Sequence, residues 1–296
     1  MTCCIEAWPG RRNAADLGEL TAGGRPDLCR RSDLPEGASQ LPGEREMAAL
    51  RQVHVYDAPD TPGLDIGQVA GYLAEMMPPV AVDARGDFFT HHLARFTPDQ
   101  IEVITEELGA RLAEREVHDL PEDRELGAVY DGSALQDVMV PLIPEQERGE
   151  DHLHIVFLTH CIGRREPSGE FSLHIIQPGR PALVSTTCFV EAPELPREYL
   201  FRRAQLEGFG MAAEVEALED EFAARTLTHA DPRVTEVAKG YALQAAFRHL
   251  LGTAACEQVT CRLHEARTHD ELTSAQISAE SRLCERHAEM LRQALE

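Results

Sequence analysis

The chain has 296 residues, and 43% of them are hydrophobic, which is enough to bury one large core or two smaller ones. Its 51 acidic and 28 basic residues leave a formal net charge of -23, which argues against binding to nucleic acid or anionic membranes. We find no apolar run long enough to cross a bilayer and no basic N-terminal segment leading into an apolar core, so we expect a cytoplasmic protein. In a reducing compartment the eight cysteines are expected to be metal ligands or buried thiols rather than disulfides.

The first 46 residues differ in composition from the rest of the chain. Residues 1–46 are rich in Gly, Pro, Arg and Ser and have no sustained apolar period. We expect a loose tail here, followed by one folded domain over residues 47–296. Cys3, Cys4 and Cys29 lie in the tail and are given no role.

Short strands and helices alternate in the first part of the expected domain. Apolar alternation predicts strands at residues 53–56 and 80–82, and helical spacing predicts a helix over residues 66–77. A further helix over residues 98–116 begins with a proline, which is favoured at the first helical position.

The second half begins with β-rich stretches and becomes mainly helical. Strands that share one sheet are expected at residues 153–158, 171–176 and 182–190. Helices are expected at residues 197–205, 212–224, 234–251 and 275–295. This order of elements favours a layered α+β fold with a single sheet.

Two pairs of ligand-type residues near the end of the chain carry the clearest chemical signal. Four residues separate Cys256 from Cys261, and two separate Cys284 from His287. Thiolate and imidazole ligands at these spacings can close a tetrahedral zinc site. Four protein ligands leave no open coordination position, so zinc here would be structural and would stabilise the helical region from about residue 245 to the end.

Single histidines in the same region allow other interpretations. His264 and His269 are alternatives to His287 as the fourth zinc ligand, or they could hydrogen-bond to a ligand. His249 lies on an apolar helical stretch, where a buried or capping histidine is more common than a metal ligand.

Other polar groups are weaker candidates for a second site. His152 and His154 alternate on a predicted strand and so face one side, where His174 of a neighbouring strand could join them to bind zinc. Glu191 and Glu198 flank two prolines in a predicted turn and could do acid–base or ligand work. A simpler interpretation of the three histidines is that they fall on strands by chance. The two glutamates are more simply explained as ion-pair partners of nearby arginines.

Residues 245–287 resemble the core of the archaemetzincins, zinc metallopeptidases with the motif H-E-x-x-H-x-x-G-x-x-H-C, a further cysteine and a final C-x-x-C. Aligned without gaps on Cys256, the positions that match are His249, Gly252, Cys256, Cys261, Cys284 and His287, the last standing in place of a cysteine. Upstream, residues 153–157 and 182–186 resemble strands of that family. The run from residue 185 to residue 199 also resembles an uncharacterised microbial family classed with the metallopeptidases. The resemblance implies a zincin-like mixed, twisted sheet with helices.

The chain departs from the family's motif at the residues that perform catalysis. The first histidine, the catalytic glutamate and the third histidine are replaced by Ala245, Ala246 and Ala255. A zincin needs those histidines to hold the metal and the glutamate to deprotonate the bound water. No H-E-x-x-H sequence occurs anywhere in the chain, so we expect no archaemetzincin-type peptidase activity.

We therefore expect an archaemetzincin-like protein with one structural zinc ion and no working catalytic site, which binds a peptide or protein partner instead of cutting it. The alternative is a metal-dependent hydrolase with a remodelled metal centre. That centre would draw on His249 together with His152, His154, His174 or the pair Glu191 and Glu198. The two hypotheses differ in the number of metal ions per chain.

Overall fold

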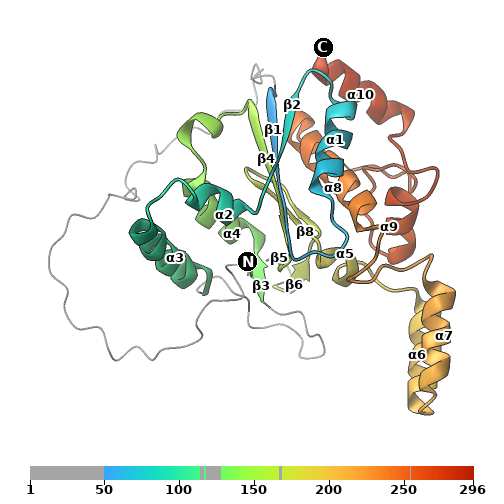
Figure 1. Ribbon diagram of the computed structural model, residues 1–296. Coiled ribbons are helices and arrows are strands. Elements are labelled where there is room, and N and C mark those ends of the chain that lie inside the picture. The colour runs from blue at the N-terminus through green and yellow to red at the C-terminus, as the bar shows by residue number, and fades with distance from the viewer. Residues whose placement is uncertain (1–49, 114–116, 118–127, 167–168, 254) are drawn as a thin grey trace, which may run out of the picture. The chain divides into compact units, whose positions relative to one another are not determined.

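The computed structural model describes residues 50–113, 117, 128–166, 169–253 and 255–296 (Figure 1). The expected tail over residues 1–46 lies outside these ranges, as do its three cysteines. Residues Ala49–Glu296 form one unit in terms of internal contacts.

A five-stranded sheet lies at the centre of this unit, with the strand order β2-β1-β4-β8-β7. Its strands are β1 (Gln52–Tyr56), β2 (Ala81–Arg85), β4 (His152–Leu158), β7 (Ile176–Gln177) and β8 (Ala182–Ser185). Four of them run parallel, and only β7 is antiparallel to its neighbour β8. The near-continuous apolar run of β4 is buried on both faces, as expected for an inner strand of a parallel sheet.

Two helices cover one face of the sheet, namely α1 (Ile66–Met76) and α8 (Val234–Leu251). Asp65 caps α1 by accepting a hydrogen bond from the Gln68 backbone N–H at 3.0 Å. Helix α8 is apolar around most of its circumference and is therefore largely buried. It ends at Gly252, whose φ of 71° is the left-handed conformation that glycine adopts without strain.

The opposite face of the sheet is covered by α2 (Phe88–Leu93), α4 (Gly132–Met139) and the 3-10 turns at Val140–Leu142 and Glu145–Glu147 (Figure 1). Helix α3 (Pro98–Ala113) packs against α4. Val53 and Val55 of β1 belong to the main apolar core, whereas Tyr56 contacts Phe88 and His92 of α2. Alternate residues of β1 thus point to opposite faces, and His54 points to the α2 side.

A small second sheet contains β3 (Val129–Asp131), β5 (Cys161–Arg165) and β6 (Phe171–Leu173), and β5 was not predicted. The expected strand at residues 171–176 is divided, so the expectation of one shared sheet was wrong. The His174 N–H bonds to the carbonyl of Ile162 in β5, while the carbonyl of Ile175 accepts the N–H of Ser185 in β8. The chain therefore passes from one sheet to the other at His174 and Ile175.

Strand β8 also ends earlier than the predicted residue 190. After Ser185 the chain turns and forms the short helix α5 (Cys188–Glu191). The Ser185 hydroxyl oxygen accepts the backbone N–H of Cys188 at 3.1 Å, which favours the turn over a longer strand.

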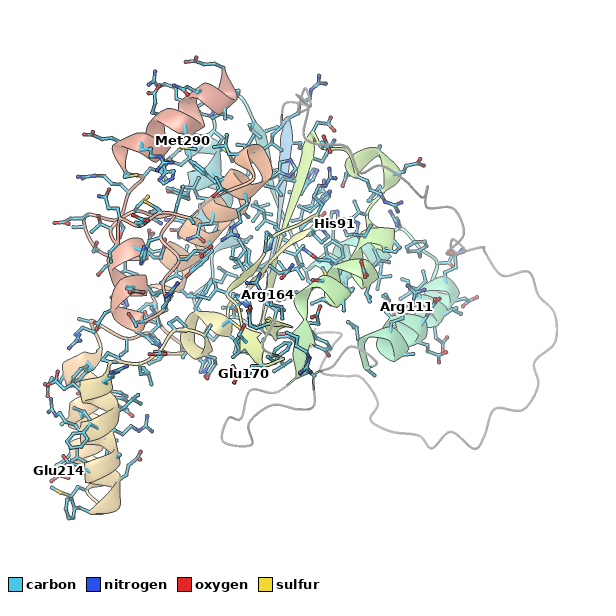
Figure 2. The ribbon with its side chains drawn as sticks, turned by 180° about the vertical axis from the view of Figure 1, so that it is seen from behind. His91, Arg111, Arg164, Glu170, Glu214 and Met290 are labelled. Atoms are coloured by element: carbon cyan, nitrogen blue, oxygen red, sulfur yellow. The ribbon has the colours of Figure 1, made fainter. Side chains whose placement is uncertain are left out.

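A helical hairpin of α6 (Arg197–Gly208) and α7 (Ala212–Phe222) projects from the rest of the described unit (Figures 1 and 2). It has its own small core of Tyr199, Leu218 and Phe222. Phe209, between the two helices, is 78% exposed. The hairpin is thus held mainly by its own contacts.

The expected helix at residues 275–295 is interrupted, and this prediction was wrong. Helix α9 (His269–Gln276) is followed by a turn, and α10 (Glu285–Leu295) begins only after Cys284. In the turn, the Arg262 N–H bonds to the carbonyl of Arg282, and Cys284 has an extended backbone. Cys284 is consequently the N-cap residue of α10 rather than an interior helical residue.

The expected α+β fold with a mixed sheet is confirmed. Among the helices that the structure describes, none combines the length and the apolar character needed to cross a membrane.

Candidate metal centres

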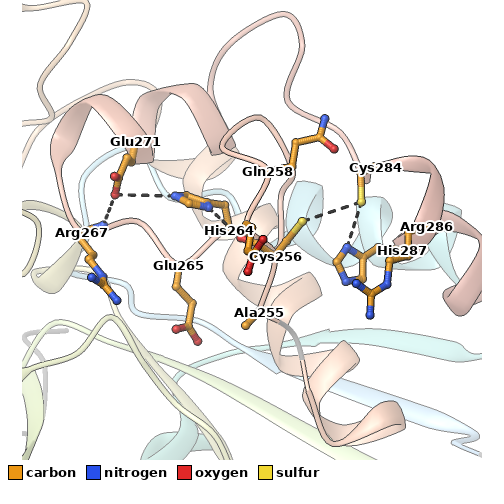
Figure 3. Close-up of a pocket in the computed structure, with 11 residues that line it drawn as sticks. Ala255, Cys256, Gln258, His264, Glu265, Arg267, Glu271, Cys284, Arg286 and His287 are labelled. Atoms are coloured by element: carbon orange, nitrogen blue, oxygen red, sulfur yellow. Dashed lines mark hydrogen bonds and ion pairs between the residues drawn. The ribbon is translucent and has the colours of Figure 1, made fainter.

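Three cysteines and a histidine converge between the loop after α8 and the start of α10 (Figure 3). The donor atoms of Cys256, Cys261, Cys284 and His287 all lie within 4.8 Å of one another. The Cys256 and Cys284 sulfurs are 3.9 Å apart, and His287 Nδ1 lies 3.1 Å from the Cys284 sulfur and 3.7 Å from the Cys261 sulfur. A tetrahedral zinc ion with Zn–S bonds of about 2.3 Å separates its sulfur ligands by roughly 3.8 Å. The four side chains therefore fit zinc in both donor type and spacing.

Burial and hydrogen bonding shift the pKa values of the cluster in different directions. Burial, together with the adjacent Cys256 thiol, raises the pKa of Cys261 to about 12. Burial also acts to raise the pKa of Cys284, but the hydrogen bond from the backbone N–H of His287 and those with the Cys261 and Cys256 side chains outweigh it and lower that pKa. Burial and the nearby Arg286 lower the pKa of His287, so its imidazole is neutral near pH 7.

The backbone around the cluster is well ordered by hydrogen bonds. The Cys256 N–H bonds to the carbonyl of Leu263, and the Cys284 N–H donates to the Cys261 sulfur at 3.5 Å. The ring of Phe247, on α8, lies edge-on to the ring of His287. A metal ion at this point would connect the loop that follows α8 to the start of α10.

His264 and His269 both form hydrogen bonds with backbone groups. His264 Nδ1 donates to the carbonyl of Cys256 at 2.9 Å, which places it beside the cluster without joining it. His269 accepts the Leu227 N–H through Nδ1 and donates to the carbonyl of Val190 through Nε2, each at 3.0 Å. The geometry therefore favours His287 as the fourth donor.

The positions of α8 that match the peptidase motif hold no metal-binding group except His249. Ala245 and Ala246 are 2% and 0% exposed and belong to the main apolar core. His249 Nε2 donates to the carbonyl of Glu150 at 2.8 Å, and Ala255 is exposed. Among the described residues, the groups that could hold a metal ion do not include His249.

The remaining candidates from the sequence lie apart from one another. Glu191 forms an ion pair with His229 at 2.9 Å, and Glu198 lies 3.9 Å from both Arg202 and Arg225 on the exposed hairpin. The structure thus gives the two carboxylates separate cationic partners. His174 approaches Ser172 and Glu166 beside the small sheet, so it does not join His152 and His154.

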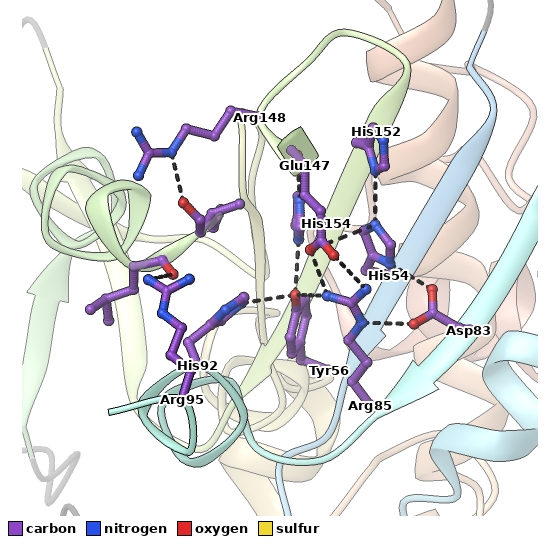
Figure 4. Close-up of polar contacts among 12 residues, drawn as sticks. His54, Tyr56, Asp83, Arg85, His92, Arg95, Glu147, Arg148, His152 and His154 are labelled. Atoms are coloured by element: carbon purple, nitrogen blue, oxygen red, sulfur yellow. Dashed lines mark hydrogen bonds and ion pairs between the residues drawn. The ribbon is translucent and has the colours of Figure 1, made fainter. Parts of the chain in front are cut away.

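A second polar cluster occupies the α2 side of the five-stranded sheet (Figure 4). In the parallel register, His54 of β1 lies directly between Asp83 of β2 and His154 of β4. His54 and His154 are 0% and 2% exposed. His54 Nδ1 lies 2.6 Å from the Asp83 carboxylate, and His54 Nε2 lies 3.0 Å from His152 Nδ1.

Arg85 joins this cluster to the turn at Glu145–Glu147. Its guanidinium donates to both carboxylate oxygens of Glu147 at 2.8 and 3.2 Å, to Asp83 at 2.7 Å and to the Tyr56 hydroxyl at 2.8 Å. These hydrogen bonds lower the pKa of Glu147 to about 2. The donor atoms of His54, Glu147 and His154 lie within 4.8 Å of one another, which makes this a second group able to hold a metal ion.

Sequence reasoning found His152 and His154 in this cluster but missed His54, Asp83, Arg85 and Glu147. One signal for His54 was present, because it alternates with the apolar Val53 and Val55 on a predicted strand and so faces away from their core. Glu147 comes from a turn, and nothing in its local sequence indicates which strand it approaches.

The buried His92 predicts a measurable pH dependence. Burial lowers the pKa of His92 to about 3 from its ordinary 6.5. Burial is the largest cause of this shift, and the charges of four neighbouring groups add to it: His91, His154, Arg95 and Arg85. Between pH 6.5 and pH 3 the unfolded chain therefore binds one more proton than the folded chain. The free energy of unfolding should fall as the pH is lowered through this window, by up to about 1.4 kcal/mol per pH unit from this group.

The variant His92→Gln should lose this part of the slope while keeping a hydrogen bond to the Tyr56 hydroxyl, which lies 2.9 Å from His92 Nε2. Urea denaturation between pH 6.5 and pH 4.5 measures the difference. Above about pH 7.5 the two proteins should have parallel profiles, because His92 is neutral in both states there. Equal slopes at acid pH would contradict the prediction.

The fold and the Cys–His cluster together define an α+β protein with a group of side chains that could hold a metal ion such as zinc. The model of the "Probable metallopeptidase family (DUF6775)" matches residues 49–294, and the chain belongs to this family. The expected membership in an uncharacterised family classed with the metallopeptidases is thereby confirmed.

Among solved structures, the chain is similar to the crystal structure of archaemetzincin from Methanopyrus kandleri. The identity is 14%, the alignment covers 83% of this chain and 96% of that chain, and the TM-score is 0.39. No curated protein matches the chain.

Proposed function

We propose that this chain is a non-proteolytic, zinc-binding member of its metallopeptidase family, in which zinc stabilises the C-terminal region instead of acting on a peptide bond. Cys256, Cys261, Cys284 and His287 would hold the ion. Four protein donors would leave no coordination position for a reacting water. A reducing cytoplasm belongs to the proposal, because the thiolates must stay reduced to bind zinc.

The observation that carries the proposal is the packing of Ala245 and Ala246. These residues stand where the archaemetzincin motif has its first histidine and its catalytic glutamate, and both are buried in an apolar core. A methyl group can neither bind the metal nor accept a proton from water. One imidazole, that of His249, is left, and its Nε2 already donates to the backbone of Glu150.

A peptide or protein partner is the role we propose for the rest of the surface. The α6–α7 hairpin carries two exposed aromatic residues, Phe201 and Phe209. The acidic residue Glu214 lies on the same hairpin (Figure 2). Exposed aromatic side chains on a projecting element favour association, and the formal charge of -23 favours a basic partner.

A peptidase assay on the zinc-loaded chain tests the proposal. We expect no cleavage of unfolded protein or of a mixed fluorogenic peptide library above the level of a blank, with or without a chelator. His249→Ala should behave like the parent chain. Hydrolysis that stops on chelation and is lost in His249→Ala would overturn the proposal, because it would place a working metal at the motif position.

The alternative of a metal-dependent hydrolase with a remodelled centre is favoured by one observation, the convergence of His54, His154 and Glu147. Two imidazoles and a carboxylate would leave a coordination position open for water. In the same assay, chelator-sensitive hydrolysis that survives His249→Ala but is lost in Glu147→Gln would favour this alternative.

A further inference from the structure

The cluster on the α2 side of the sheet combines features that a buried structural network does not require. His54 and His154 project from adjacent parallel strands at the same level of the sheet, and Glu147 reaches them from a turn. His152 lies two residues before His154 on the same strand and is partly exposed. The group thus runs from a buried histidine pair to a histidine that solvent can reach (Figure 4).

The orientation of His54 is that of a metal-ligating histidine. Its Nδ1–H donates to Asp83 at 2.6 Å, which leaves the lone pair on Nε2. A carboxylate behind a histidine sets the tautomer and the ring orientation of metal ligands in the same way. Nε2 faces His152 Nδ1 at 3.0 Å and the Glu147 carboxylate at 4.0 Å. The donor atoms of the three proposed ligands, His54, His154 and Glu147, lie within 4.8 Å of one another, a spacing at which one metal ion can be held.

We propose that this cluster binds a second divalent transition-metal ion, Zn²⁺ in the first place, through His54, His154 and Glu147, with His152 beside them at the solvent side. This site lies on the opposite face of the sheet from α8 and shares no residue with the archaemetzincin motif or with the Cys–His cluster. It does not rest on the proposed function.

The donor set selects the class of ion. Imidazole nitrogen with one carboxylate oxygen suits zinc and its first-row neighbours, whereas Ca²⁺ and Mg²⁺ require mainly oxygen ligands. With three protein donors, the ion would keep a position for water or for a small anionic ligand.

Arg85 is a cation that would compete with a metal ion for the Glu147 carboxylate. The geometry of its hydrogen bonds nevertheless allows a metal ion to bind the same carboxylate. Arg85 donates to both oxygens of Glu147, but each carboxylate oxygen has two lone pairs, so the group can bridge a guanidinium and a metal ion. His154 must also exchange a hydrogen bond, either the one to the Tyr56 hydroxyl or the one to the carbonyl of Glu147. The site should therefore bind zinc more weakly than the Cys–His cluster.

Equilibrium dialysis of the full chain against a small excess of Zn²⁺, and in parallel Co²⁺, tests the proposal. We expect two metal ions per chain. Glu147→Gln and His54→Gln should each bind one ion, and that ion should keep the thiolate-to-cobalt charge-transfer absorption of the Cys–His cluster. The matched control Glu145→Gln, an exposed carboxylate on the same turn, should still bind two. His54 is fully buried, so if His54→Gln does not fold, the comparison of Glu147→Gln with Glu145→Gln decides.

Two results would overturn the proposal. One is a single ion per parent chain with thiolate-to-cobalt absorption, retained in Glu147→Gln. The other is two ions per chain that Glu147→Gln and His54→Gln leave unchanged. A single ion without thiolate absorption that Glu147→Gln loses would instead support this site and refute the structural zinc of the proposed function, so the two ideas fail separately.

Discussion

The double variant Cys256→Ala, Cys261→Ala is expected to lose one zinc ion per chain and to melt far below the parent protein. Structural zinc contributes on the order of 10 kcal/mol to small zinc domains, and part of that is expected here because a large apolar core remains. A loss of roughly 5 kcal/mol would lower the melting temperature by about 10 to 20 °C. Metal content by mass spectrometry and thermal denaturation by circular dichroism measure the two effects.

The control for this variant is Cys161→Ala, Cys188→Ala, which removes two buried thiols outside the Cys–His cluster. It should keep the zinc and lose stability only through the small cavities that it creates. Retention of the zinc in the Cys256 and Cys261 variant, or its absence from the parent chain, would refute the assignment of the four ligands. Amide hydrogen exchange should locate the loss of protection in α9, α10 and the loop between Gly252 and Thr268.

Arg85→Met is expected to be strongly destabilising, although it replaces a charged side chain on the α2 side of the sheet by an apolar one of similar length. It removes the cation that lies between the carboxylates of Asp83 and Glu147, and it also removes the hydrogen bond to the buried Tyr56 hydroxyl. Breaking one side of a largely buried ion pair leaves uncompensated charge, and we expect a loss of about 3 kcal/mol in the free energy of unfolding. Urea denaturation at neutral pH in the absence of added metal measures it.

Arg111→Met is the matched control, because Arg111 pairs with Glu107 one helical turn away on the exposed side of α3. Such a surface pair contributes only about 0.5 kcal/mol. Equal stability of the two variants would show that the Arg85 network is solvated and contributes little. If the second metal site exists, excess Zn²⁺ should restore part of the stability of Arg85→Met and none of that of Arg111→Met.

The agreement between sequence and structure is closest where the interactions are local. The caps and apolar spacing of α1 and α8 are encoded within a few residues, and the helices were predicted close to their observed bounds. The Cys–His cluster was also recognisable, because its ligands come in two pairs that are closely spaced along the chain. Even so, a continuous helix was predicted over residues 275–295, so the turn that places Cys284 at the N-cap of α10 was missed.

The agreement fails where the chain pairs with distant segments. The division of residues 171–176 between two sheets depends on β5 and β8 as partners, and single-segment periodicity does not reveal them. His174 was expected beside His152 and His154, but it follows β6 to the small sheet. The same limit hid the meeting of His54 with residues almost one hundred positions away.

By itself, the sequence determined the thiolate and imidazole pairs near the C-terminus and the replacement of three motif residues by Ala245, Ala246 and Ala255. Only the tertiary structure decided which histidines share a site, because the register of parallel strands is set by packing between segments far apart in the chain. His54, Glu147 and His154 became neighbours through that register, whereas Cys284 and His287 were neighbours along the chain from the start.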